Sequence, residues 1–302
     1  MDIAKTSVSI ERLAISFSLT LEAENKSVRT RNGYLESLTL FQRFLADSGH
    51  SGIIGDVQRS EIEMYLADLF SRGRTASTVA TRYKGLRQFF NWALADGEIT
   101  ENPMANMKPP IIPESPVPVV TEDEMRRLIK CCTGTTFEDR RDLAIILLLV
   151  DTGIRRSECA NLKVGDVDLT ERSALVLGKG RRPRAVRFGA KTARAVDRYL
   201  RIRDAHPLGD TAHLWLGQRS RGFTDIALRQ MLERRGMEAG IPNLHAHRFR
   251  HSFAHQYLAS GGNEGDLMQL TGWKSRQMLN RYGASVAAER ARANYESPAD
   301  RL

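Results

Sequence analysis

Apolar residues recur every three or four positions in three segments of the first hundred residues, a spacing typical of amphipathic helices. The segments are residues 29–47, 60–70 and 78–95. In the first of them the apolar positions are Tyr34, Leu38, Phe41 and Leu45. The pattern predicts an all-helical N-terminal domain over residues 1–107.

A proline-rich stretch follows this predicted domain. Residues 101–118 have the sequence ENPMANMKPPIIPESPVP. Proline fixes φ, removes a backbone donor and disfavours helix in the residue before it. We therefore expect an extended linker over residues 108–118 and a second domain over residues 119–302.

The second predicted domain mixes helical and strand-like patterns. Residues 139–151 carry an apolar run closed by Gly153, as at the C-terminal end of a helix. Residues 173–177 and 185–188 are short β-prone runs on either side of GKGRRPR, which predicts a hairpin with a basic tip. Helical periodicity returns over residues 191–302. The expected fold class is mainly α, with a mixed α/β second domain that carries a small β-sheet.

The excess positive charge lies in the second predicted domain. The 302 residues have a net charge of +9, and residues 1–110 hold 13 basic and 13 acidic residues, so the whole excess follows residue 110. Of the 45 basic residues, 36 are Arg, whose guanidinium fork matches phosphate geometry. These features favour a polyanionic partner. A basic surface that is merely solvated is the alternative that composition leaves open.

Several classes of protein are excluded by the sequence. The longest apolar run, residues 143–150, has eight residues, whereas a membrane-spanning helix needs roughly 20. The N-terminus lacks the continuous apolar region of a secretory signal. The three Cys residues favour a reduced chain, so we expect a cytoplasmic protein. The sequence contains no GxxxxGK[ST], HExxH or paired CxxC motif, and we expect no cofactor and no metal.

Four short segments of the second domain carry candidate chemistry. They are TGIRRSE with Arg155, GKGRRPR with Lys179, HAHRFRHSFAHQYL with His247 and Arg250, and TGWKSRQMLNRYG with Trp273 and Tyr282. Each segment alone has a structural explanation: a connection between helices, a solvated basic turn, a charged surface or a buried aromatic ring. The informative feature is their order along one basic domain.

That order, Arg, Lys, His, Arg, Trp and Tyr, resembles the tyrosine recombinase (phage integrase) family, and in particular its Xer-like site-specific recombinases. The resemblance covers residues 28–295 and includes TVATRYKGLRQFFNWALADGEITENPM, which is similar to the end of the family's N-terminal domain and its linker. It implies a helical, SAM-like core-binding domain followed by a catalytic domain. The implied activity is cleavage and rejoining of DNA strands through a covalent 3′-phosphotyrosine, without ATP or metal.

The resemblance also implies a role for each candidate residue. Arg155, Arg250 and Trp273 would hold the non-bridging phosphate oxygens, as an oxyanion hole does. Tyr282 would be the nucleophile, and Lys179 on the hairpin would protonate the departing 5′-oxygen.

His247 belongs to one of two overlapping His-x-x-Arg pairs. His247 would accept the phenol proton or donate to the phosphate, and the sequence leaves both roles open. An overlapping pair, His245 and Arg248, has the same spacing. The family's arginine is followed by His, a variable residue, Phe and often Ala, a pattern that fits Arg250 and not Arg248.

The implied partner is double-stranded DNA carrying recombination sites. Candidate DNA contacts are Arg74, Arg82, Lys84 and Arg87 near the last helix of the first domain, and Arg181 and Arg182 on the hairpin. The resemblance implies a dimer and a tetramer on DNA, with a helix over residues 286–295 packed on a neighbouring protomer; a frayed tail is the alternative. Accessory proteins and a partner recombinase stay open.

Two other functions compete with site-specific recombination. A type IB topoisomerase would share the tyrosine chemistry but relax supercoils as a monomer. A catalytically silent, DNA-binding architectural protein would retain the fold alone. The sequence does not distinguish integration, excision, inversion and dimer resolution.

Overall fold

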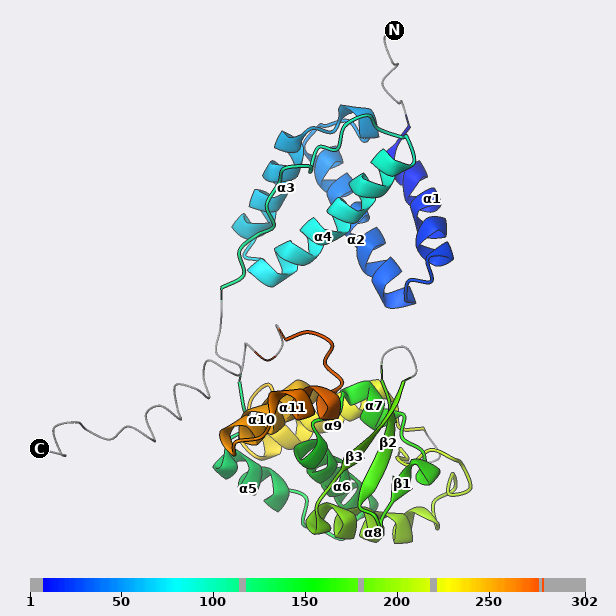
Figure 1. The fold of residues 1–302 in the computed structure, drawn as a ribbon, viewed down its shortest axis with the longest axis vertical. Helices are drawn as coiled ribbons and strands as arrows, with labels where there is room; N and C mark the ends of the chain where they lie inside the picture. Colours follow the sequence, from blue (N-terminus) through cyan, green and yellow to red (C-terminus); the bar gives the residue numbers. More distant parts are fainter. Residues whose placement is uncertain (1–7, 114–117, 179–181, 218–221, 277–278, 280–302) are drawn as a thin grey trace, which may run out of the picture. The chain divides into compact units, whose positions relative to one another are not determined.

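The computed structural model describes residues 8–113, 118–178, 182–217, 222–276 and 279. The chain divides into two compact units, Met1–Ser115 and Pro116–Leu302 (Figure 1). The described helices include none with the length and apolar character that crossing a membrane requires.

The described part of the first unit folds into four α-helices and one 3₁₀ turn. The elements are α1 (Ile10–Ala23), α2 (Val28–Asp47), η1 (Ile54–Asp56), α3 (Arg59–Ser71) and α4 (Ala76–Ala95). Helices α2 and α4 approach closely at Gly85, where an added Cβ would lie 2.6 Å from the side chain of Ser37. The core between the helices is aromatic, with the rings of Phe17 and Phe89 centred 5.5 Å apart.

Helix α1 was not predicted from the apolar pattern. The Ser9 hydroxyl caps it by accepting from the backbone N–H of Arg12, and its buried positions are Ile10, Leu13, Phe17 and Leu21. Two further apolar residues, Ile15 and Leu19, are exposed on its outer face. They blur the periodicity that would otherwise have marked the helix.

The second unit contains the remaining elements. They are α5 (Glu122–Lys130), α6 (Phe137–Thr152), α7 (Arg156–Ala160), η2 (Val164–Asp166), β1 (Val167–Asp168), β2 (Ser173–Leu177), β3 (Pro183–Arg187), α8 (Ala190–Arg203), α9 (Asp225–Glu238), α10 (Ala246–Ala259) and α11 (Glu264–Thr271). The predicted fold class, mainly helical with a small sheet, is confirmed. The helical periodicity expected from residue 191 onward is wrong for the described residues 204–217 and 222–224, which form turns and isolated bridges between α8 and α9.

The sheet is antiparallel, in the order β1-β2-β3 (Figure 1). Strand β2 pairs with β3 from Ser173 opposite Arg187 to Leu177 opposite Pro183. Helix α6 supplies fully buried residues such as Ile145 and Leu149 to the core of this unit. It packs against α8 and α10 and also touches β3. Its C-terminal end therefore leads into a region where α7, α10, α11 and β3 come together.

Candidate active site

A tight turn presents Arg155. Helix α6 ends at Gly153, which adopts a left-handed conformation with φ of 55°. A Cβ at this position would come within 2.7 Å of the Phe253 ring, so only glycine satisfies both the backbone and the space. Ile154 is fully buried and anchors the turn. Arg155 then stands at the N-cap of α7.

The Arg155 guanidinium is held on two sides and remains partly open to solvent. Its Nη2 donates to the carbonyl oxygen of Gly272 at 3.0 Å, and its Nη1 donates to Glu158 Oε1 at 2.8 Å. The Arg155 backbone N–H also donates to Glu158, to Oε2 at 2.9 Å. The side chain keeps 32% of its surface exposed, so it is fixed in position yet accessible to a ligand.

Arg250 reaches the same place from α10. It is 4% exposed, and its Nη1 donates to the carbonyl of Gly153 at 2.8 Å while its Nη2 donates to that of Thr271 at 2.6 Å. Its guanidinium carbon lies 5.3 Å from the ring centre of Trp273, within the range of a cation–π interaction. The structure thus brings three of the predicted residues, Arg155, Arg250 and Trp273, around one short turn.

Two charged residues of this cluster were not among the predicted site residues. Glu158, buried on α7, accepts from Arg155 and also from Arg184 on β3, at 3.0 Å to Oε1 and 2.7 Å to Oε2. Burial alone would raise the pKa of Glu158, but the hydrogen bonds from Arg184 and Arg155 lower it to about 2. Arg184 could have been found by strand alternation, since it lies on the same face of β3 as buried Val186.

His247 lies near this cluster on the surface. It stands on the first turn of α10, and its ring centre is 6.2 Å from that of His251. Partial desolvation and the positive charge of Arg250 lower the pKa of His247. Near neutral pH this favours the uncharged imidazole, which can accept a proton.

The overlapping pair has different surroundings. Arg248 is buried and donates to the carbonyl of Val119 at 2.9 Å and to Glu124 at 3.1 Å. The Nδ1 atom of His245 lies 2.7 Å from the carbonyl of Asn243. The Arg248 side chain therefore ties α10 to the start of α5, while Arg250 joins the cluster around Arg155.

Three predicted residues, Lys179, Arg181 and Tyr282, lie outside the described residues. Arg182 is exposed beside the hairpin. Among the described side chains, no group of three or more His, Cys, Asp and Glu is arranged to hold a metal ion.

The predicted DNA contacts of the first unit divide into two kinds. Arg82 is paired with Glu36 at 2.9 Å, and Arg87 donates to the Tyr83 hydroxyl at 3.3 Å. Arg74 and Lys84 are exposed. Thus two of the four are partly committed to contacts inside the protein.

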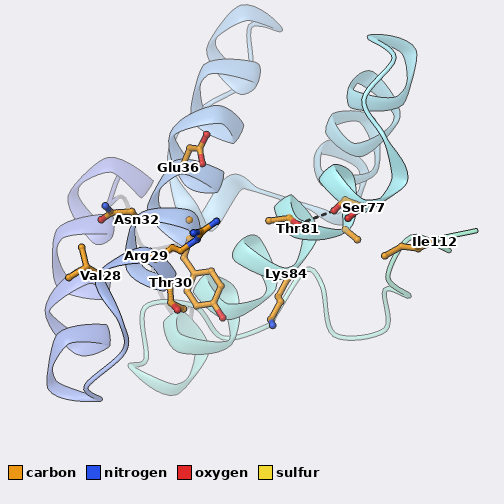
Figure 2. Close-up of a pocket in the computed structure, with 12 residues that line it drawn as sticks. Val28, Arg29, Thr30, Asn32, Glu36, Ser77, Thr81, Lys84 and Ile112 are labelled. Carbon is orange, nitrogen blue, oxygen red and sulfur yellow. Dashed lines mark hydrogen bonds between the residues drawn. The ribbon is translucent and has the colours of Figure 1, made fainter. Parts of the chain in front are cut away.

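Lys84 lines a wide groove between the N-terminal halves of α2 and α4 (Figure 2). The groove has a volume of about 1260 Å³. Its polar walls include Arg29, Asn32, Ser77 and Thr81 (Figure 2). Arg29 and Lys84 form no ion pair with any described residue, so both charges are available to an anionic ligand.

Comparisons with known proteins identify the chain. Residues 118–289 match the phage integrase family, and residues 13–98 match the phage integrase N-terminal SAM-like domain. Tyrosine recombinase XerC of Bacillus pumilus (strain SAFR-032) is 29% identical over 294 residues, which are 95% of this chain and 96% of that relative. The chain is a site-specific DNA recombinase of the tyrosine type. It belongs to the phage integrase family.

Two solved structures have a similar fold. The XerH site-specific recombinase, bound to a palindromic difH substrate after cleavage, has a TM-score of 0.74 and 18% identity, covering 96% of this chain and 90% of that one. A lambda integrase tetramer bound to a Holliday junction has a TM-score of 0.72 and 18% identity, covering 90% and 79%. The topoisomerase and architectural alternatives receive no support from these matches.

Proposed function

We propose that Tyr282 attacks a DNA phosphodiester that is held by Arg155 and Arg250. The phenol oxygen forms a bond to phosphorus, the bond to the 5′-oxygen breaks, and a 3′-phosphotyrosine results. A 5′-hydroxyl of a second strand reverses the step and rejoins the DNA. The observation that carries this proposal is the convergence of Arg155 and Arg250 on the carbonyls of Gly272 and Thr271.

The geometry of these arginines suits the charge that develops during the reaction. A phosphodiester under attack gains negative charge on its non-bridging oxygens, and preorganised donors stabilise that charge. Arg155 and Arg250 are each held by hydrogen bonds to backbone carbonyls, so little reorganisation is needed when the phosphate arrives. Trp273, packed against Arg250, supplies an indole N–H as a further donor.

Two proton transfers complete the step. His247, with its lowered pKa, accepts the phenol proton of Tyr282 or donates to the phosphate. Lys179, predicted on the hairpin, protonates the 5′-oxygen as it leaves.

DNA recognition is assigned to both units. In the first unit, we assign phosphate and base contacts to Arg74 and to the groove that contains Arg29 and Lys84; Arg82 and Arg87 mainly support the helices. On the hairpin, Arg181 and Arg182 contact the backbone near the cleaved phosphate.

The substrate is proposed to be a pair of double-stranded DNA recombination sites. Both the XerH complex and the lambda integrase tetramer contain DNA, and we propose a dimer on each site and a tetramer on the pair, in the cytoplasm. The helix expected over residues 286–295 would link neighbouring protomers. A partner recombinase or an accessory protein would determine which outcome follows.

The test is to trap the covalent intermediate. Purified protein is incubated with a DNA pool that includes the regions flanking its own gene, with Tyr282→Phe in parallel. We expect an SDS-resistant, protease-sensitive adduct with the wild type alone, and sequencing of the trapped DNA gives the site. Binding without an adduct would contradict the proposed cleavage, and an adduct with Tyr282→Phe would assign the nucleophile to another residue.

A further inference from the structure

Three arginines hold three consecutive carbonyls where α11 ends. Arg184 Nε donates to Leu270 at 2.9 Å, Arg250 Nη2 to Thr271 at 2.6 Å and Arg155 Nη2 to Gly272 at 3.0 Å. The last carbonyls of a helix lack partners within the helix, and they carry its negative dipole end. Cationic donors therefore satisfy and neutralise this end of α11.

Arg184 is the member of the three that has no part in the proposed phosphate site. Only 14% of its side chain is exposed. Its Nε, Nη1 and Nη2 atoms all donate, one to Leu270 and two to Glu158. With its donors directed inward, Arg184 is poorly placed to bind phosphate itself.

Arg184 and Arg155 share one carboxylate symmetrically. Oε1 of Glu158 accepts from Nη1 of each arginine, at 2.8 Å from Arg155 and 3.0 Å from Arg184. Oε2 accepts from the Arg155 backbone N–H at 2.9 Å and from Arg184 Nη2 at 2.7 Å. A Cβ added to Gly272 would lie 3.3 Å from Arg184 Nη1 and 3.5 Å from Arg155 Nη1, so the two guanidinium groups flank this glycine.

The balance between the three arginine charges and the Glu158 charge determines how much positive charge the site offers to a phosphate. Glu158 cancels one of the three guanidinium charges, which leaves a net charge of about +2 toward a phosphate. Without Arg184 the net charge would fall to about +1, and Glu158 would compete directly with the phosphate for Arg155. The helix end would also regain an unneutralised carbonyl.

We infer that Arg184 is a positioning residue for the proposed cleavage reaction. It holds Glu158 and the Leu270–Gly272 turn, so that Arg155 stays oriented toward the phosphate and its positive charge is not fully cancelled by Glu158. The inference rests on the proposed function. Because Arg184 lies on β3, it also fixes the base of the hairpin to the turn that carries Arg155.

The experiment measures single-turnover cleavage of the DNA site recovered from the trapped adduct. Arg184→Gln, Arg184→Lys, Glu158→Gln and the double variant Arg184→Gln/Glu158→Gln are compared with wild type. The matched control is Arg187→Gln, an exposed arginine on the same strand. DNA affinity and thermal unfolding are measured for every variant.

We expect Arg184→Gln to lower the cleavage rate by about 10- to 100-fold, by analogy with the loss of residues that orient the ligands of a metal site. DNA affinity should change little, and Arg184→Lys should recover part of the rate. The double variant should be no slower than the slower single variant, since both changes disrupt one unit. Arg184→Gln removes hydrogen bonds that lower the pKa of Glu158, so this pKa should rise. The acid limb of the pH–rate profile should therefore move to higher pH.

Two results would overturn the inference. One is a cleavage rate for Arg184→Gln equal to that of Arg187→Gln. The other is a double variant whose loss equals the product of the two single losses. If Arg184→Gln fails to fold, the rate and pH profile of Arg184→Lys decide the question. Failure of the proposed function is distinguishable, because the wild type itself would then form no adduct.

Discussion

Arg155 and Arg250 donate hydrogen bonds to the carbonyl oxygens of adjacent residues, Gly272 and Thr271. One arginine comes from the cap of α7 and the other from the interior of α10. A substrate phosphate bound between them would accept hydrogen bonds from both α7 and α10. The end of α11 fixes the position of these two helices relative to each other, because both arginines donate to it.

Replacing Arg155 by Lys should slow cleavage more than it weakens DNA binding. A lysine retains the charge but loses the fork that contacts both Gly272 and Glu158. Loss of one preorganised donor costs about 2.7–4 kcal/mol of barrier, or roughly 10²- to 10³-fold in rate. Single-turnover cleavage measures the effect. An exposed arginine on α9, Arg229, provides the control as Arg229→Lys, and equal rates for the two variants would contradict the assignment.

Replacing Arg248 by Met should reduce stability and leave the cleavage chemistry intact. Arg248 is buried and donates to Val119 and Glu124, and leaving such partners unpaired costs about 1–3 kcal/mol. Urea unfolding should therefore shift to lower midpoints, while the cleavage rate of the folded enzyme stays near that of wild type. A catalytic defect larger than that of Arg250→Lys would reverse the choice between the two overlapping His-x-x-Arg pairs.

Replacing Asp142 by Asn should strongly destabilise the second unit. Its carboxylate is fully buried and accepts from Arg141, Arg234 and Arg235, at 2.8–3.0 Å. Breaking such a buried ionic network leaves uncompensated charge and costs about 3–5 kcal/mol. We expect Asp142→Asn to lower the free energy of unfolding by that amount in urea titrations. A loss of stability no larger than that caused by Asp197→Asn, a change in a half-exposed surface ion pair, would show that the network is not stabilising.

The apolar pattern predicted most of the helices, but it did not predict the contacts between them. Arg155 and Arg250 are implied by the family resemblance, which depends on the order of four segments and not on any one of them. The pairing of Glu158 with Arg184, and of Asp142 with Arg235, joins elements that are distant in sequence. Neither pairing has a periodic signature, because it depends on how β3 and α9 pack against α6 and α7.

Stability should fall at acid pH through Glu158. Its pKa of about 2 lies below the ordinary value of 4.5, so the stabilisation is present above pH 4.5 and is lost as the pH falls toward 2. The shift corresponds to roughly 3 kcal/mol. Urea unfolding of wild type and Glu158→Gln between pH 6 and pH 3 measures this contribution, and wild type should lose more stability over that interval. Parallel losses in the two proteins would contradict a lowered pKa in the folded state.

DNA affinity should depend on the groove of the first unit through Arg29 and Lys84. Both are exposed, line the groove and form no ion pair with a described residue (Figure 2). Each phosphate contact contributes about 0.9 to the slope of log affinity against log salt, so Lys84→Ala should lower that slope by about this amount if it neutralises one phosphate. Arg82→Ala serves as the comparison, because Arg82 is already paired with Glu36 and its loss should change the slope less.

Loss of a contact to a base would instead weaken binding to the recombination site far more than binding to unrelated DNA. Unchanged affinity for both DNAs in the double variant Arg29→Ala/Lys84→Ala would remove the groove from the DNA interface.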